Sequence, residues 1–256
     1  DWAKALDLVT EALKRFAREV ILVAPLPLSE GRPQFEVAPA TAFLQVAYPW
    51  VQTPGSEGLP DKLESPDGVL TGILARNALV RGTFRSAANH HLADVVDLYP
   101  VLDRHQQEAN RFIERVCLMG PSPSGLRLLS DVTMSGSETY RPGAISRLLA
   151  TIVRTARRVG EEVTFQPSGE RLWNEVANRL DTFLRGLFVR GILRGESAGE
   201  AYQVRCDRST MTQADIDEGR VIAQVQFDAA APVDTITVVL VVNEGRQVPA
   251  IQNEAA

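Results

Sequence analysis

The sequence has 256 residues, of which 45% are hydrophobic and 23% are charged, and its formal net charge is −5. This composition is typical of a globular protein, and the length allows one large domain or two modest ones. The acidic balance disfavours a nucleic-acid-binding surface, because such a surface needs clustered Lys and Arg to displace counterions from phosphates. Basic residues are most concentrated at Arg154, Arg157 and Arg158. There we expect a solvent-exposed helix face, with a phosphate-binding face as the alternative.

Cysteine usage and apolar run lengths narrow the class of protein further. Cys117 and Cys206 lie far apart and form no motif, which disfavours a secreted disulfide scaffold and a paired-cysteine zinc site. The longest apolar runs, such as Val238 to Val242, are far too short to span a bilayer, so we expect no membrane insertion. No signal peptide is visible. The sequence begins at Asp1 rather than Met, which is compatible with a missing upstream segment.

Short apolar runs alternate with breaker-rich segments in the first part of the sequence. Apolar residues from Trp2 to Val20 recur at steps of three and four and predict an amphipathic helix. The runs VILVAPLP (20–27) and AFLQVAYPW (42–50) predict buried strands that end at prolines. Residues 51–68 are rich in Pro and Gly and predict an exposed loop.

The middle of the sequence predicts a short helix followed by two strands. The helix is expected over residues 68–82. Residues 92–102 and 115–120 are apolar and β-branched enough to predict strands.

The pattern then becomes strongly helical. Apolar residues from Ile145 to Val153 lie on one helix face, and those from Leu172 to Leu187 form a second, longer stripe. Ser168 is a good N-cap candidate for the second helix, and Gly191 is expected to help end it, followed by Gly195.

The last part of the sequence predicts strands and one capped turn. AYQVRC (201–206) alternates, and RVIAQVQF (220–227) and DTITVVLVV (234–242) predict two further strands. Thr212 followed by Asp215 is typical of a capping pair for a single helical turn.

The motifs of the sequence favour a protein that catalyses no reaction. GPSPSG (120–125) is not followed by Lys and Ser or Thr, so it is no Walker loop, and no dinucleotide fingerprint or nucleophile elbow occurs. We therefore expect no cofactor. The only histidines are His90, His91 and His105, and their spacing to nearby aspartates matches no metal-ligand pattern, so we expect surface polar residues. Cys206 shares a strand face with Tyr202, which predicts a half-buried core residue.

Several stretches, in order, resemble the contractile phage tail sheath family. AYPWV (47–51) followed by DGVLTGILARNALVRGTFRSAAN (67–89) resembles the family's Tyr-Pro-Trp segment and its Gly-rich, Arg-containing continuation. EANRFIERVCLMGPSPSGLRLLSDVTMS (108–135) resembles its Asn, apolar strand and Gly segment. Here Asp131-Val132-Thr133 stands where the family usually has Ala-Arg-Thr.

The resemblance continues through the second half of the sequence. YRPGAISRLLATIVRT (140–155) is similar to the family's Arg-Leu-Leu helix, and residues 163–195 are similar to its Val-Phe-x-Pro block, with Ser168 in place of the usual Asn. AYQVRCD (201–207) is similar to Ala-Tyr-x-Val-x-Cys-Asp, and residues 217–240 are similar to its last strands. The ordered series covers about residues 40–242, and the first forty residues match more weakly.

This resemblance implies a structural protein rather than an enzyme. Sheath subunits stack as hexameric rings in a helix around an inner tube, and contraction of a metastable extended form drives the tube into a target cell. The implied partners are the chain itself, the inner tube protein, and baseplate and tail-terminator proteins, in a virion tail or phage-tail-like particle assembled in the bacterial cytoplasm. A baseplate- or terminator-proximal paralogue fits the same motifs. The alternative from another class is a soluble α/β enzyme that uses Cys206 or the His90/His91/His105 group.

The implied fold is mixed α/β, a compact sheath core with a C-terminal helix pair and a small sheet completed by strands from neighbouring subunits. We expect residues 1–132 to form the N-terminal part of the core, residues 133–244 the C-terminal sheath domain, and residues 245–256 a flexible arm. Strand addition at an exposed edge would supply the contact between subunits. The candidate interface residues alternate along the last two strands: Val221, Ala223, Val225, Phe227, Ile236, Val238, Leu240 and Val242.

Overall fold

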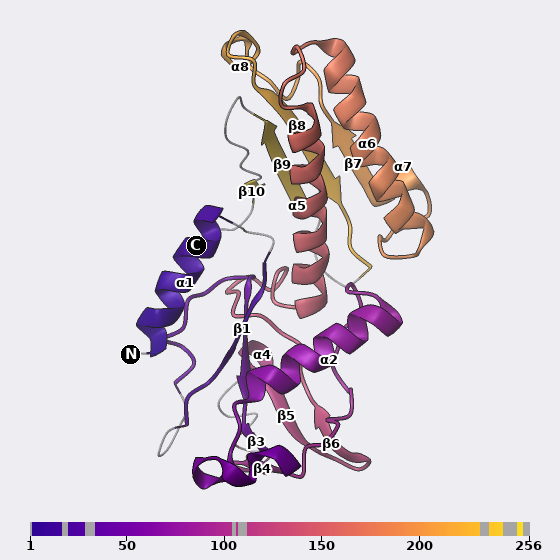
Figure 1. The fold of residues 1–256 in the computed structure, drawn as a ribbon. Helices are drawn as coiled ribbons and strands as arrows, with labels where there is room; N and C mark the ends of the chain where they lie inside the picture. Colours follow the sequence, from indigo (N-terminus) through magenta and orange to yellow (C-terminus); the bar gives the residue numbers. More distant parts are fainter. Residues whose placement is uncertain are drawn as a thin grey trace. The chain divides into compact units, whose positions relative to one another are not determined.

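The computed structural model describes residues 2–16, 20–28, 34–103, 106, 112–230, 236–242 and 250–252. The chain forms two compact units, Asp1–Ala150 and Thr151–Ala256 (Figure 1). The fold is mixed α/β, as the sequence predicts. Within the described residues, no helix is both long and apolar enough to cross a membrane. The expected boundary between the N-terminal part of the core and the C-terminal sheath domain, at residues 132 and 133, stays a prediction.

The first unit contains short strands joined by helices and 3-10 turns. Its elements are α1 (Trp2–Phe16), β1 (Leu22–Pro25), β2 (Leu44–Tyr48), β3 (Trp50–Gln52), η1 (Pro54–Gly58), η2 (Pro60–Lys62), α2 (Pro66–Arg81), β4 (Asp97–Tyr99), α4 (Phe112–Arg115), β5 (Cys117–Ser122), β6 (Gly125–Leu128) and the start of α5 (Gly143–Val163).

The sheet of the first unit has the order β1-β2-β5-β6. β1 and β2 are parallel, β2 and β5 are parallel, and β5 and β6 form an antiparallel pair. The predicted strands at 20–27, 42–50 and 115–120 are therefore confirmed as β1, β2 and β5. β2 is buried along its whole length, which explains why all its residues except Gln45 are apolar or aromatic.

Three details of the first unit differ from the sequence prediction. The predicted strand over residues 92–102 is reduced to β4, three residues long, which pairs with β3 in a separate two-stranded sheet. The prediction missed β6, because its sequence Gly125–Leu128 contains a glycine and an arginine and is too short to show alternation. The loop predicted over 51–68 contains β3 and two 3-10 turns before α2 begins at Pro66.

The predicted N-terminal helix is confirmed as α1, but its buried face is narrower than the apolar stripe suggests. Leu6 and Thr10 are buried, whereas Val9 is 43% exposed. Val20 lies after the end of the helix and is also exposed. The predicted helix over 68–82 is confirmed as α2, which begins two residues earlier because Pro66 fits the first helical turn.

The second unit contains most of the long helix α5, followed by α6 (Glu170–Val189), α7 (Ala198–Ala201), β7 (Tyr202–Arg205), α8 (Gln213–Asp217), β8 (Val221–Phe227), β9 (Ile236–Val242) and β10 (Ala250–Gln252). Its sheet has the order β10-β9-β8-β7, and every neighbouring pair is antiparallel. Figure 1 shows α6 running along β7 and β8. The predicted helix pair and the strands at 201–206, 220–227 and 234–242 are confirmed.

The helix caps were predicted with mixed success. Thr212 and Asp215 form the expected capping box at the start of α8. Gly191 adopts the left-handed conformation with φ 68° just after α6, which is the helix ending that favours glycine. The Ser168 prediction is wrong, because Gly169 occupies the N-cap position of α6 and no side chain caps that end.

Candidate subunit-assembly site

The sheet of the second unit offers backbone edges at which another strand can pair. β9 pairs with β8 over seven residues, from Val221 opposite Val242 to Phe227 opposite Ile236. On its other edge, β9 pairs with β10, with Thr237 opposite Gln252 and Val239 opposite Ala250. Antiparallel pairing of this kind depends on main-chain hydrogen bonds, so it accepts a strand with little demand on its sequence. Part of the outer edge of β9 is thus occupied by β10 of the same chain.

The eight candidate interface residues lie on β8 and β9, but their side chains face the core of their own unit. Each of them is at most 6% exposed. Burial alternates along β8, and the intervening residues Ile222, Gln224 and Gln226 are half-buried. The structure thus shows why these positions are apolar: they fill the core beneath the sheet. A role in subunit contacts would pass through the backbone of β9, and it stays a prediction.

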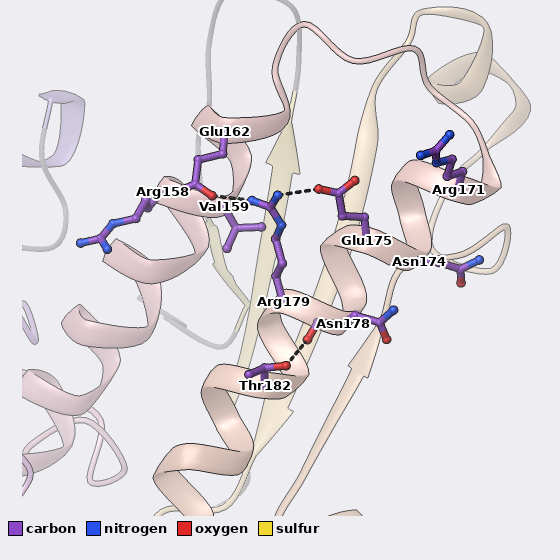
Figure 2. A pocket seen from close by; sticks show the side chains of 9 residues that line it. All are labelled: Arg158, Val159, Glu162, Arg171, Asn174, Glu175, Asn178, Arg179 and Thr182. Atoms are coloured by element: carbon purple, nitrogen blue, oxygen red, sulfur yellow. Dashed lines mark hydrogen bonds and ion pairs between the residues drawn. The ribbon is translucent and has the colours of Figure 1, made fainter.

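An open groove lies between α5 and α6 in the second unit (Figure 2). It has a volume of about 650 Å³. Arg179 on α6 pairs with Glu162 on α5 and with Glu175, whose Oε1 lies 2.5 Å from the Arg179 Nη2. Arg158 and Arg171 extend from the same groove in Figure 2. Arg179 thus pairs with one carboxylate on each helix, so ion pairs join α5 and α6 at this groove.

The first unit holds a buried polar network that the sequence did not reveal. The Asp131 carboxylate receives two hydrogen bonds from the Arg147 guanidinium, at 2.6 and 2.9 Å. Gln45 Nε2 donates to Asp131 Oδ1 at 2.9 Å, and the Ala87 backbone N–H donates to Oδ2 at 2.7 Å. The Asp131 side chain is fully buried, and that of Arg147 is 10% exposed. This is the geometry that makes a buried ion pair tolerable, because both charges are hydrogen-bonded.

The network determines the ionisation of Asp131 and the residue at position 143. Burial by itself would raise the pKa of Asp131, but the hydrogen bonds and charge of Arg147 lower that pKa below its ordinary value of 3.8. Gly143 lies against the same groups: a Cβ there would meet Asp131 Oδ1 and would lie 2.7 Å from Gln45 Nε2. In the sequence, Asp131 is marked only by its place where the resembled motif has alanine, and this does not identify the partners of Asp131.

The structure gives no support to a catalytic thiol. Cys206 is buried, and burial raises its pKa to about 12, with a further contribution from the nearby Asp207 charge. Cys117 is also buried, its pKa is likewise raised to about 12 chiefly by burial, and its thiol donates to the Val132 carbonyl. A thiol with so high a pKa carries almost no thiolate at neutral pH and is a poor nucleophile. The prediction that Cys206 is a core residue is confirmed.

The histidine group is only partly described. His90 Nε2 lies 3.1 Å from Asn77 Oδ1, and burial and the nearby Arg81 lower the His90 pKa. His91 is exposed and pairs with Arg127 through a backbone bridge, and His105 lies outside the described residues. In the part of the chain that the structure describes, no cluster of three His, Cys, Asp or Glu side chains could hold a metal ion.

Sequence comparison alone identifies no relative, since no family model and no curated protein matches the chain. The structure, in contrast, matches solved proteins. A chain from the anti-feeding prophage helical sheath in its contracted state is 26% identical, with a TM-score of 0.74. The match covers 88% of this chain and 63% of that one. A chain in the anti-feeding prophage baseplate is also 26% identical, with a TM-score of 0.75 over 88% of this chain and 62% of that one.

A more distant protein shares the fold. A sheath tail protein from Listeria innocua is 12% identical and has a TM-score of 0.68, with 96% of this chain and 55% of that chain covered. This chain thus spans less than two thirds of the length of each of these proteins. These matches confirm the resemblance of the chain to contractile tail sheath proteins, which the ordered sequence motifs had indicated.

Proposed function

We propose that the chain is a structural subunit of the contractile sheath that surrounds the inner tube of a phage tail or a phage-tail-like injection particle. The observation that carries this proposal is the likeness to the contracted anti-feeding prophage sheath, at 26% identity over 88% of the chain. The chain covers the greater part of that protein but not all of it, so the assembly behaviour of the whole subunit belongs to the proposal.

The proposed mechanism is mechanical rather than chemical. Energy is stored in an extended helical lattice whose subunit contacts are less well satisfied than those of the contracted lattice. Contraction exchanges the first set of contacts for the second and drives the tube through a target envelope. No nucleotide is needed in this scheme, because the free energy is already present when the sheath is assembled. The high thiol pKa values argue against catalysis by either cysteine.

The proposed partners follow from the same role. Copies of the chain stack as hexameric rings, and the stack contacts the inner tube, the baseplate and a tail-terminator protein. The site of action is a virion tail or phage-tail-like particle, assembled in the bacterial cytoplasm. The formal net charge of −5 supports partners that are proteins rather than nucleic acids.

Neighbouring subunits in this scheme are linked by strand exchange at β9. The outer edge of β9 accepts an antiparallel strand, as its pairing with β10 demonstrates within one chain. A strand from a neighbour would satisfy the same backbone groups and would cover an apolar edge that is otherwise an aggregation hazard. Residues 245–256 are the proposed arm that is donated.

Electron microscopy tests the proposed function directly. The purified chain should form hollow striated tubes in negative stain, and the absence of tubes under all assembly conditions would refute the sheath role. A chain truncated after Val242 tests the arm. It should fail to form helical sheaths, and normal sheaths from the truncated chain would refute the proposed exchange of arms.

A second candidate function is that of a baseplate-proximal sheath paralogue. The likeness to a chain in the anti-feeding prophage baseplate, with a TM-score of 0.75, favours it. The two functions differ in copy number. A paralogue of this kind would form a single ring or short stack on a baseplate, whereas a main sheath subunit would propagate into tubes many rings long.

A further inference from the structure

The outer edge of β9 already carries a strand of the same chain. Thr237, Val238 and Val239 lie opposite Gln252, Ile251 and Ala250 in an antiparallel register. The inner edge of β9 pairs with β8 along all seven of its residues. β9 therefore has one edge left for a partner, and β10 lies on the part of that edge nearest the start of the strand. Any strand from another chain that takes this register must first displace β10.

The short connection between the two strands makes their pairing hard to displace from solution. Val239 and Ala250 are eleven positions apart (250 − 239), so closing this loop costs little conformational entropy. Two segments joined so closely meet at an effective concentration on the order of millimolar. The corresponding strand of a free neighbour present at about 1 μM would therefore compete for β9 at a concentration roughly 1,000-fold lower than that of β10.

We propose that β10 is an autoinhibitory strand that occupies, on its own β9, the site that a neighbour's corresponding strand takes in the assembled sheath. The inference rests on the proposed function and adds a reason why assembly starts slowly from free subunits and continues readily at the end of an existing sheath. At the growing end of a sheath, the neighbour's strand is itself held nearby, so it has a comparable effective concentration. Replacing the subunit's own β10 by the neighbour's strand breaks one set of contacts and forms an equivalent set. The free-energy change of this exchange is therefore close to zero, as in domain swapping.

One variant closes the site reversibly. Val239 and Ala250 are direct antiparallel partners, whose Cα atoms lie about 4.5–5.5 Å apart, within the range that a disulfide spans. The double variant Val239→Cys/Ala250→Cys can therefore be locked by oxidation and released by reductant. The native Cys117 and Cys206 are buried, with pKa values of about 12, so they should not compete for the oxidant.

A second variant opens the site. Ile251→Pro lies at the centre of β10, where proline removes a backbone N–H and disfavours strand pairing. Ala255→Pro, placed beyond the last residue of β10, is the matched control. The probe is a fluorescently labelled peptide with the sequence of residues 247–256, and its binding to the full-length chains is followed by fluorescence anisotropy.

The peptide should bind Ile251→Pro at least about 100-fold more tightly than the unmodified chain, since the competing strand is then absent from the site. Ala255→Pro should behave like the unmodified chain, and the oxidised double cysteine variant should not bind the peptide at all. Equal binding to the unmodified chain and Ile251→Pro would overturn the inference, because the edge would then be open in the free subunit.

The lock should also stop assembly. The oxidised double variant should form no tubes, and reduction should restore tube formation to the level of the unmodified chain. When oxidation follows assembly, the disulfides should join different subunits and give a ladder of multimers on a non-reducing gel. Tubes formed equally well by the locked chain would overturn the inference. If the reduced chain forms no tubes either, the proposed function fails, and the peptide measurement still decides whether β10 occupies the site.

Discussion

The two units stabilise their sheets in different ways. The mainly parallel sheet of the first unit is linked through Gln45 of β2 to the buried Asp131–Arg147 ion pair, in which each charge is hydrogen-bonded by the chain itself. The antiparallel sheet of the second unit is built from alternating apolar side chains on β8 and β9. A satisfied polar centre permits one arrangement of the groups around it, whereas an apolar sheet with an available edge can exchange the strand that lies on that edge. The first unit therefore has a fixed polar centre, whereas the edge of β9 in the second unit is where we propose that strands are exchanged.

The largest effect is expected when the polar centre of the first unit is broken. Asp131→Ala removes the carboxylate that balances the charge of the nearly buried Arg147 guanidinium, which keeps its hydrogen bonds to the Thr83 and Arg85 carbonyls, and the unfolding free energy should fall by about 3–5 kcal/mol. Chemical denaturation followed by circular dichroism measures this change. The matched control is Glu218→Gln, which removes one partner of the exposed pair with Arg220 and should leave stability nearly unchanged. Equal effects in both variants would contradict the contrast between the units.

The corresponding break in the second unit is Leu240→Ala. Leu240 is fully buried on β9, so its truncation leaves a cavity and should cost about 2–5 kcal/mol of unfolding free energy. Val241→Ala, at the neighbouring half-buried position, is the control and should cost clearly less. Comparable losses at the two positions would indicate that the strand has no preferred buried face.

A smaller effect is expected from a single added methyl group in the first unit. Gly143→Ala places a Cβ against Asp131 Oδ1 and Gln45 Nε2, so the network must shift to admit it. Overpacking of this kind should cost about 1–3 kcal/mol of unfolding free energy. Gly136→Ala, where a Cβ would meet no atom within 4 Å, is the control in the same denaturation measurement. An unchanged midpoint for Gly143→Ala would show that the network is loosely packed.

The capping box of α8 provides a local test in the second unit. Thr212 Oγ1 accepts from the Asp215 backbone N–H, and Asp215 in turn accepts from the Thr212 backbone N–H. Thr212→Ala removes the first of these contacts and should cost about 1 kcal/mol. Thr212→Ser, which keeps the hydroxyl, should recover most of the loss. If Thr212→Ser were as unstable as Thr212→Ala, the loss of stability would come from the threonine methyl group rather than from its hydroxyl.

The smallest effect near neutral pH concerns the ionisation of Asp131. The pKa of this carboxyl in the folded chain lies below its ordinary value of 3.8, because the pairing with Arg147 outweighs the effect of burial. Its contribution to stability is therefore complete above pH 3.8 and is lost as the pH falls through the folded-state pKa. Denaturation midpoints measured between about pH 5 and pH 2 should fall less steeply in Asp131→Ala than in the unmodified chain. Parallel curves would show that Asp131 does not titrate in this way.

Most elements of the fold could be predicted from local sequence patterns. Helices α5 and α6 carry apolar stripes over several turns, and β8 alternates strictly, so each element shows its buried face along the sequence itself. The Thr212–Asp215 cap could be predicted for the same reason, because its two partners are three residues apart. β6 was missed because four residues are too few to establish a period.

The candidate site was less accessible to sequence reasoning. The alternation of Val225 and Val238 identifies them as apolar strand positions, but not which side of the strand the chain's own core covers. The pairing of β10 with β9 was also missed, because three residues in a polar tail give no periodic signal.

By itself, the sequence determined the mixed α/β class, the order of the main elements and the resemblance to the sheath family, since these depend on periodicity and on motifs of adjacent residues. The tertiary structure alone decided that Gln45, Ala87, Asp131 and Arg147 meet at one buried point and that β10 lies on the edge of β9. The physical reason is distance along the chain. Hydrogen bonds between residues up to 102 positions apart (147 − 45) leave no local pattern, and backbone pairing at a strand edge hardly depends on side-chain identity.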